Sequence, residues 1–308
     1  MTKTLRHGDA ASRQAKPMNF ADELERIAKL TERKLDALIP VASTRLGEAM
    51  RYALLGPGKR LRPFLVVSSA RVFGVPEAQG LETAAALECI HCYSLVHDDL
   101  PCMDDDDLRR GRPTTHIAFD EATAVLVGDG LLTLAFEIMS RPEIDPDPAI
   151  RVELVSLLAQ AAGWHGMVLG QALDLEAEGR SLNMDETLRM QALKTGALFK
   201  FACEAGAVLG RAKPDARRAL LDYATALGQA FQLADDLLDA QSTTAKLGKT
   251  AAKDAARGKA TFIALLGIDG AKAKLAGLIR DAESALAPLG AEAEPLAEAA
   301  RFVATRES

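Results

Sequence analysis

Aromatic residues and cysteines are scarce in this chain of 308 residues, and no long uninterrupted hydrophobic run is present. Aromatic residues make up 5% of the chain, with one Trp and three Tyr, and there are four cysteines. So few cysteines favour free thiols in a reducing compartment. The first twenty residues lack the apolar core of a signal peptide, and no later run has the length of a membrane span. These absences predict a cytoplasmic protein without a membrane span.

The charge balance is moderately acidic, with 37 basic and 43 acidic residues and a formal net charge of −6. A net negative charge argues against nucleic acid as a partner. It does not argue against a small anionic ligand, because such a ligand meets a local basic cluster. The hydrophobic share of 48% is ample for a sizeable core.

Apolar residues recur three and four positions apart over most of the chain, whereas strand-like alternation is scarce. Helices are predicted at residues 20–38, 81–97, 121–139, 150–169, 185–209, 215–238 and 261–286. Asp120 and Asp215 are expected at N-caps. Residues 241–259 are expected to be a surface loop with at most a short helix, and residues 1–17 a disordered tail. No Pro-, Gly- and Ser-rich linker divides the rest, so residues 18–308 are expected to form one all-α domain.

Two aspartate clusters stand in otherwise apolar helical segments. The later one, FQLADDLLD, places Asp235 and Asp239 four positions apart, and therefore on one helix face. The earlier one, HDDLPCMDDDDLRRG, has six carboxylates within the ten residues 98–107. Six carboxylates cannot all stay ionised at such proximity without a counter-charge. Mg²⁺ fits best, since it takes one or two carboxylates plus substrate phosphate oxygens, whereas the regular spacing of a calcium loop is missing.

A basic turn, GPGKRLRP at residues 56–63, comes before both clusters. Its glycines allow close approach of backbone to a ligand, and three cations follow within four residues. The spacing of a Walker loop is absent, so ATP chemistry has no support. Together with Arg109 and Arg110 just after the first acidic cluster, the turn indicates that more than one anion is bound.

These motifs make the chain resemble a short-chain trans-isoprenyl diphosphate synthase of the bacterial farnesyl or geranylgeranyl type. The matching segments are GPGKRLRP (56–63), ECIHCYSLVHDDLPCMDDDDLRRG (88–111), KTGALF (194–199), GQAFQLADDLLD (228–239), LGKT (247–250) and GKAT (258–261). The resemblance implies a bundle of long antiparallel helices around a deep cavity, built as a homodimer. One departure is Pro57, where many members have Gly, because proline has no N–H to offer a phosphate.

The resemblance also implies the roles of individual residues. The metal ligands, for about three Mg²⁺ ions, would be Asp98, Asp99, Asp104, Asp235 and Asp239. Isopentenyl diphosphate would be bound by Lys59, Arg62, His91 and Arg110. The allylic diphosphate would be bound by Arg109, Lys194, Thr195, Gln232, Lys249 and Lys259. Catalysis would rest on Asp98, Asp104, Asp235, Lys194, Thr195 and Gln232, with no covalent nucleophile: basic groups and metal draw charge off the leaving diphosphate.

Product length is expected to depend on Tyr93 and Ser94, which lie about one helical turn before Asp98. In the family, a bulky group here ends chain growth. Tyr93 therefore favours a fifteen-carbon product, farnesyl diphosphate, while the small Ser94 leaves geranylgeranyl diphosphate as the alternative. Two remoter alternatives are a terpene cyclase and a non-catalytic partner subunit, and the complete second aspartate motif argues against both.

A few further residues have competing interpretations. Cys89, Cys92 and Cys102 are interpreted as buried thiols rather than zinc ligands, because no second CxxC follows. Trp164 and Phe136 are expected in the core. Gln171 and Asp174 either line the cavity or form a polar pair in the core.

Overall fold

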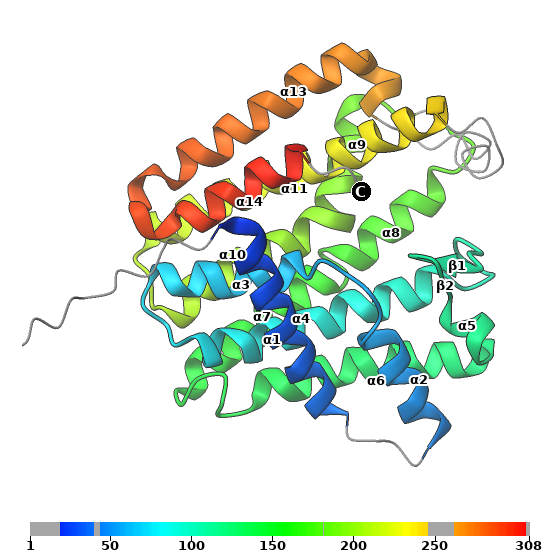
Figure 1. Cartoon of the computed structure of the whole chain (residues 1–308), viewed down its shortest axis with the longest axis horizontal. Coiled ribbons are helices and arrows are strands. Elements are labelled where there is room, and N and C mark those ends of the chain that lie inside the picture. Colours follow the sequence, from blue (N-terminus) through cyan, green and yellow to red (C-terminus); the bar gives the residue numbers. More distant parts are fainter. Residues whose placement is uncertain (1–18, 40–43, 181, 246–261, 306–308) are drawn as a thin grey trace, which may run out of the picture.

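The structure is a computed structural model that describes residues 19–39, 44–180, 182–245 and 262–305. Within these ranges it is an all-α bundle with one short hairpin, whose two strands have two residues each (Figure 1). The longer helices are α1 (Phe20–Leu38), α3 (Leu61–Val72), α4 (Glu77–Asp98), α6 (Glu121–Ser140), α7 (Pro148–Ala162), α10 (Ala197–Leu209), α11 (Pro214–Ala245), α13 (Phe262–Leu286) and α14 (Glu294–Thr305). The all-α prediction is confirmed.

Short elements connect these helices. They are α2 (Arg45–Leu54), α5 (Thr115–Ala118), α8 (Met167–Glu176), α9 (Met184–Gln191), a π-helical turn η1 (Ala192–Gly196), and the 3-10 turns η2 (Ala287–Leu289) and η3 (Ala291–Ala293). Strands β1 (Leu108–Arg109) and β2 (Arg112–Pro113) form an antiparallel hairpin.

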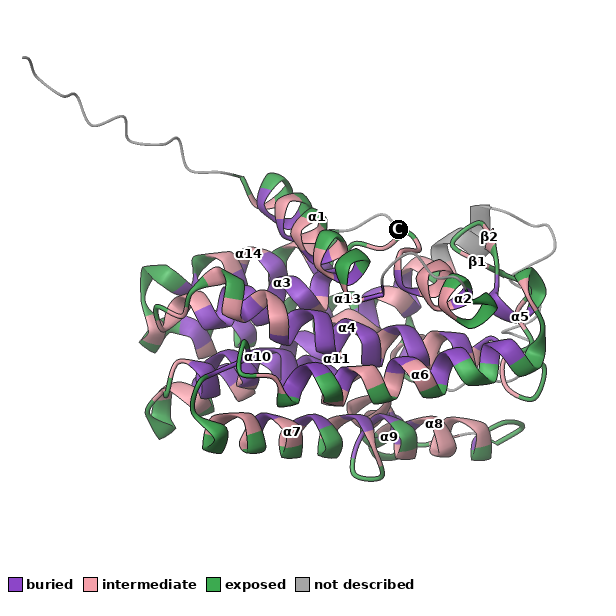
Figure 2. Ribbon diagram, turned by 90° about the horizontal axis from the view of Figure 1, so that it is seen from below, coloured by how far each residue is buried: buried purple, intermediate pink, exposed green. Residues whose placement is uncertain are grey.

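Helix α4 lies in the middle of the bundle, between α3 and α6 (Figure 2). Its residues from Thr83 to Ile90 are buried without interruption. A helix that is buried on all sides needs small or apolar residues around its circumference. The sequence AAALECI at residues 84–90 supplies them, with Glu88 as the single charged exception. The end of α4 therefore carries the first aspartate motif from the core of the molecule to its surface.

Local capping explains where several helices begin. The side chains of Asn19 and Asp120 accept hydrogen bonds from backbone N–H groups in the first turns of α1 and α6. The N-cap prediction is correct for Asp120 and wrong for Asp215. Helix α11 starts one residue earlier, at Pro214, because proline suits the first helical position. Asp215 lies in the first turn instead, where its charge favours the helix dipole.

Two predicted helices are interrupted. The segment 150–169 breaks after Ala162, because Gly163 leaves helical geometry with φ −92° and ψ −143°. Trp164 follows in the connecting turn and is 71% exposed, so its core assignment is wrong. The segment 185–209 contains the π turn η1. Helix α11 continues to Ala245, beyond the predicted end at residue 238 and into the predicted loop.

Other expectations have mixed outcomes. Phe136 is half-buried against the core, while Cys89 and Cys92 are buried. Cys102 is exposed, contrary to expectation, because it sits in the turn after α4. The predicted tail at residues 1–17 and the rest of the predicted loop lie outside the described residues.

The length and composition of the helices do not show whether this chain spans a membrane. Within the described ranges, two segments are long and apolar enough for a span, Glu121–Ser140 and Pro148–Glu176. Core helices of globular bundles meet the same criteria. The absence of a membrane span therefore stays a prediction.

Candidate active site

The first aspartate motif folds back onto the end of α4. The backbone N–H of Asp104 donates to the carbonyl of Asp98 at 2.8 Å, and that of Asp106 to the carbonyl of Asp99 at 3.2 Å. Asp105 has a positive φ of 52°, which Asp tolerates better than most residues. This turn brings Asp104 close to Asp98, so that the two carboxylates act on each other electrostatically.

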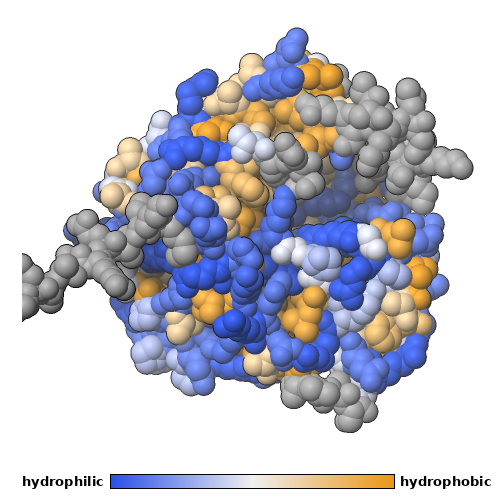
Figure 3. All heavy atoms as spheres, in the orientation of Figure 1, coloured by the Kyte–Doolittle hydropathy of each residue, from blue (hydrophilic) through white to orange (hydrophobic). Residues whose placement is uncertain are grey.

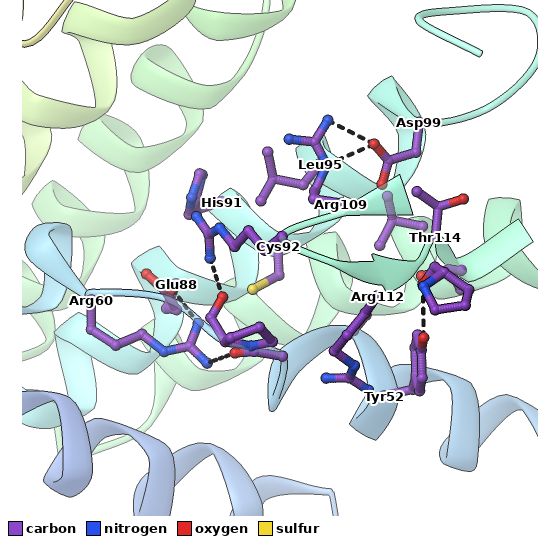
Figure 4. A pocket seen from close by; sticks show the side chains of 17 residues that line it. Tyr52, Arg60, Glu88, His91, Cys92, Leu95, Asp99, Arg109, Arg112 and Thr114 are labelled. Atoms are coloured by element: carbon purple, nitrogen blue, oxygen red, sulfur yellow. Dashed lines mark hydrogen bonds and ion pairs between the residues drawn. The ribbon is translucent and has the colours of Figure 1, made fainter. Parts of the chain in front are cut away.

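Asp98 and Asp99 face different surroundings. Burial raises the pKa of Asp98 to about 6, with Lys194 lowering it and Asp104 raising it further. Asp98 lines a cavity of about 380 Å³. Asp99 instead accepts from Arg109 at 2.6 Å and lines a smaller cavity beside the hairpin (Figure 4). Its predicted role as a metal ligand stays a prediction, and in this structure its partner is Arg109.

The cavity of about 380 Å³ has both polar and apolar lining residues. Its polar lining includes Asp98, Lys194 and Thr195. Its apolar or aromatic lining residues include Tyr93, Met103, Met167, Val168, Ala172, Leu175 and Leu198. Tyr93 and Ser94 both line it, as the sequence predicted. The shape and lining suit a ligand with an anionic head and a hydrocarbon tail.

Lys194 and Thr195 project from the π turn η1. Such turns within helices are frequently found at functional sites. Lys194 Nζ pairs with Asp174 at 2.6 Å, and Thr195 Oγ1 donates to Gln232 Oε1 at 3.1 Å. Gln171 lines the same cavity, and its Nε2 is buried without a hydrogen-bond partner among the described residues. Gln171 thus belongs to the cavity wall, whereas Asp174 is the ion-pair partner of Lys194.

A second cavity, of about 590 Å³, lies next to the first. Arg62 and His91 line both cavities, so they stand between them. The second cavity is also lined by Gly58, Lys59, Arg110, Phe231, Asp235 and Phe302. Figure 3 shows a hollow bordered by hydrophilic side chains on the face viewed in Figure 1. The basic turn and the second aspartate motif therefore meet at one cavity.

The buried guanidinium of Arg62 has a hydrogen-bond donor that no described residue uses and that could bind an anion. Its guanidinium lies 5.0 Å from the Phe199 ring centroid and 3.4 Å from His91 Nε2. Its Nε is buried and has no hydrogen-bond partner in the described part of the chain. Burial lowers the pKa of Arg62, and burial together with Arg62 holds the pKa of His91 well below its usual range. A buried donor without a partner is costly until an acceptor arrives.

The basic turn is held from inside by Arg60, a residue that the sequence analysis did not single out. Arg60 has a positive φ of 52° and pairs with Glu88 of α4 at 2.6 Å, with both side chains almost fully buried. It also donates to the carbonyls of Leu54 and Gly56. Figure 4 shows this guanidinium beside Glu88. The signal in the sequence was Glu88 itself, a lone charge within an apolar helix.

The hairpin adds Arg109 and Arg110 to the site. Arg110 donates to the carbonyl of Pro57, so the residue that lacks an N–H contributes through its oxygen. Nearby, Arg112 stacks on Tyr52 with its guanidinium carbon 4.2 Å from the ring centroid. These contacts fix the position of the hairpin relative to the basic turn.

The second aspartate motif lies on α11. Asp235 lines the second cavity, while Asp239 is exposed. Asp236 between them is buried and accepts from the backbone N–H of Phe262 at 2.8 Å, which ties α11 to the start of α13. Burial raises the pKa of Asp236 to about 6. Lys249 and Lys259 lie outside the described residues.

No group of three or more metal-ligating side chains is preassembled in the described ranges. That fits a site in which each Mg²⁺ takes only one or two carboxylates and completes its shell with phosphate oxygens. Asp98 has the matching property, since burial disfavours its charge and a cation would restore it.

An all-α bundle with two adjoining cavities, both lined by cationic side chains, is suited to binding two anionic ligands side by side. The particular family follows from comparison. The chain belongs to the polyprenyl synthetase family, whose model matches residues 43–287.

Within this family, several similar proteins are farnesyl diphosphate synthases. The chain is 48% identical to farnesyl diphosphate synthase of Escherichia coli, over 88% of this chain and 93% of the relative. It is 46% identical to the Geobacillus stearothermophilus farnesyl diphosphate synthase, over 85% and 89% respectively. A solved FPP/GFPP synthase from Zymomonas mobilis superposes with a TM-score of 0.85 at 46% identity, covering 93% of this chain and 99% of that one.

Proposed function

We propose that this prenyltransferase condenses isopentenyl diphosphate with dimethylallyl and geranyl diphosphates and releases farnesyl diphosphate. The observation that carries the proposal is the pair of adjoining cavities separated by Arg62 and His91. Farnesyl diphosphate synthases at 42–48% identity support the fifteen-carbon product. Arabidopsis geranylgeranyl diphosphate synthases are more distant, at 38–39% identity.

The apolar cavity is proposed as the allylic site. Its mouth would hold the diphosphate with Arg109, Lys194, Thr195, Gln232, Lys249 and Lys259. Its interior would hold the hydrocarbon chain away from water. The basic cavity is proposed for isopentenyl diphosphate, bound by Lys59, Arg62, His91 and Arg110. The diphosphate would satisfy the buried Arg62 donor that has no other partner among the described residues.

Mg²⁺, three ions per site, is the proposed cofactor, held by Asp98, Asp99, Asp104, Asp235 and Asp239. When bound, it supplies Lewis acidity to the leaving diphosphate. The chain's own residues orient the allylic diphosphate and neutralise its charge. Lys194, anchored by Asp174, and the basic side chains at the mouth draw charge off the allylic diphosphate as its C–O bond breaks.

The double bond of isopentenyl diphosphate attacks the allylic carbon, and loss of a proton ends the step. Oxygens of Thr195 and Gln232, together with the Lys194 carbonyl, stabilise the positive charge on the allylic carbon. The Thr195 hydroxyl donates a hydrogen bond to Gln232 Oε1, so the lone pairs of the Thr195 oxygen stay available to the cation. The released diphosphate is the proposed base.

A homodimer in the cytoplasm is the proposed state of the protein. Exposed apolar side chains on neighbouring helices α6 and α7, Val125, Leu126 and Val152, support an interface there. Four free cysteines support a reducing compartment.

The test is an assay with radiolabelled isopentenyl diphosphate and Mg²⁺, run separately with dimethylallyl, geranyl and farnesyl diphosphates. Accumulation of a fifteen-carbon product, with farnesyl diphosphate refused as a starter, would support the proposal. A twenty-carbon product would keep the reaction and replace the product by geranylgeranyl diphosphate. Absence of condensation with every starter would reject the proposal in favour of a non-catalytic subunit, and a cyclic hydrocarbon would identify a terpene cyclase.

A further inference from the structure

Tyr93 shares the wall of the apolar cavity with His97, one turn later on α4. The two rings meet edge to face, with centroids 5.9 Å apart and an interplanar angle of 77°. The Tyr93 hydroxyl has no hydrogen-bond partner in the described part of the chain, so packing alone sets the orientation of its ring. Edge-to-face contacts between rings are directional. The orientation of Tyr93 therefore depends on where His97 lies.

His97 is anchored to the neighbouring helix α6. Its Nε2 lies 3.1 Å from the carbonyl oxygen of Val125. Because a carbonyl only accepts, this nitrogen carries the proton, and the contact fixes one tautomer of the ring. The imidazole also occupies space that a side chain at Gly128 would need, since a Cβ there would lie 1.9 Å from Nε2. The His97 imidazole can thus occupy this position only because residue 128 is glycine.

We propose that His97, seated on Gly128, is a positioning residue for product length: it holds the Tyr93 ring across the apolar cavity and thereby limits chain growth. The inference rests on the proposed prenyl elongation and adds two residues, on α4 and α6, to the determinants of its product. Any side chain at position 128 displaces the imidazole, which removes the contact that orients Tyr93. The cavity then opens although Tyr93 itself is unchanged.

The decisive variant is Gly128→Ala, assayed with isopentenyl diphosphate and geranyl or farnesyl diphosphate. We expect the ratio of twenty- to fifteen-carbon product to rise by roughly tenfold or more, the range that hydrophobic pockets achieve against one small group. Gly130→Ala is the matched control on the same helix, since its Cβ would meet only the flexible end of Met50, at 3.2 Å. That control is expected to keep the fifteen-carbon product.

Two further variants separate positioning from general damage. His97→Ala removes the imidazole without crowding α6, and it decides the question if Gly128→Ala does not fold. The double variant Tyr93→Ala/Gly128→Ala is expected to give the same product as Tyr93→Ala alone, because both changes act through one ring. Melting temperatures and the KM for geranyl diphosphate are measured alongside.

An unchanged fifteen-carbon product in both Gly128→Ala and His97→Ala would overturn the inference, as would equal lengthening in Gly130→Ala. These outcomes differ from failure of the proposed function, in which the unaltered protein forms no elongated product at all.

Discussion

Burial of the Asp98 carboxyl lowers the stability of the folded protein at neutral pH. Its pKa is raised from 3.8 to about 6, mainly by burial. The folded state therefore binds a proton more tightly than the unfolded state does. Stability is lost as the pH rises from about 4 to about 6, and the loss persists above that window. A shift of about two units corresponds to at most about 3 kcal/mol.

Asp98→Asn should accordingly stabilise the metal-free protein while abolishing catalysis. At pH 8 with a chelator, we expect its free energy of unfolding to exceed that of the unaltered protein by up to about 3 kcal/mol. At pH 4 the difference should vanish. Urea denaturation at both pH values measures it, with the exposed Asp107→Asn as control. An equal difference at both pH values would contradict the burial argument.

The buried Arg60–Glu88 ion pair supports both the stability of the fold and the position of the basic turn. Glu88→Gln leaves the buried guanidinium without its counter-charge, which typically costs about 3–5 kcal/mol. Because Arg60 also binds the carbonyls of Leu54, at the end of α2, and Gly56, in the basic turn, we expect the KM for isopentenyl diphosphate to rise more than the KM for geranyl diphosphate.

Denaturation curves and the two KM values measure these effects. Glu32→Gln is the matched control, since Glu32 lies 3.7 Å from the same guanidinium but is 44% exposed. That exposed pair should contribute less than about 1 kcal/mol. If both variants behaved alike, burial would not be the reason for the effect.

Among the elements, the π turn η1 depends on its neighbour α8. A Cβ at Gly170 would lie 2.1 Å from the backbone nitrogen of Lys194. The two segments therefore approach more closely than any other residue at position 170 allows. This contact helps to position Lys194 and Thr195, which line the apolar cavity.

Gly170→Ala should push η1 away from the cavity. We expect a loss of about 1–3 kcal/mol in stability from overpacking and a fall in kcat of roughly tenfold or more. Gly277→Ala is the control, because its Cβ meets only the end of Arg280, at 3.9 Å, in the helix α13. Helix propensity predicts that the control gains up to about 1 kcal/mol. Unaltered kcat in Gly170→Ala would show that the close approach is dispensable.

Helix boundaries were predictable where the cause was local. Helix α1 begins and ends where its apolar periodicity predicts, because periodicity depends only on neighbouring residues. The break at Gly163 and the π turn were missed. The π turn packs closely against α8 at Gly170, and a periodic pattern contains no information about such contacts between segments.

For the molecule as a whole, the proposed homodimer gives a direct test. Leu126 is 54% exposed on α6, and a charge there should disrupt an apolar interface. We expect Leu126→Glu to shift the protein from dimer to monomer in light scattering. Ile268→Glu, on α13 at the opposite side in Figure 1, is the control at 45% exposure. An unaltered mass for Leu126→Glu would place the interface elsewhere.

Charge and spacing along the chain already determined the chemistry of this protein. Six carboxylates at residues 98–107, a second set on one face of α11 and a basic turn define metal and diphosphate recognition wherever they meet. These motifs can be recognised in the sequence alone because each is a short run of residues that act together.

Only the tertiary structure decided which side chains share a wall. Arg60 pairs with Glu88, and His97 rests on Gly128, across 28 and 31 positions of sequence. It also turned Asp99 away from Asp98, its neighbour, towards Arg109. Such choices depend on helix packing and on burial, which set the free energy of each charge and the space for each ring. A linear pattern of residues carries neither quantity.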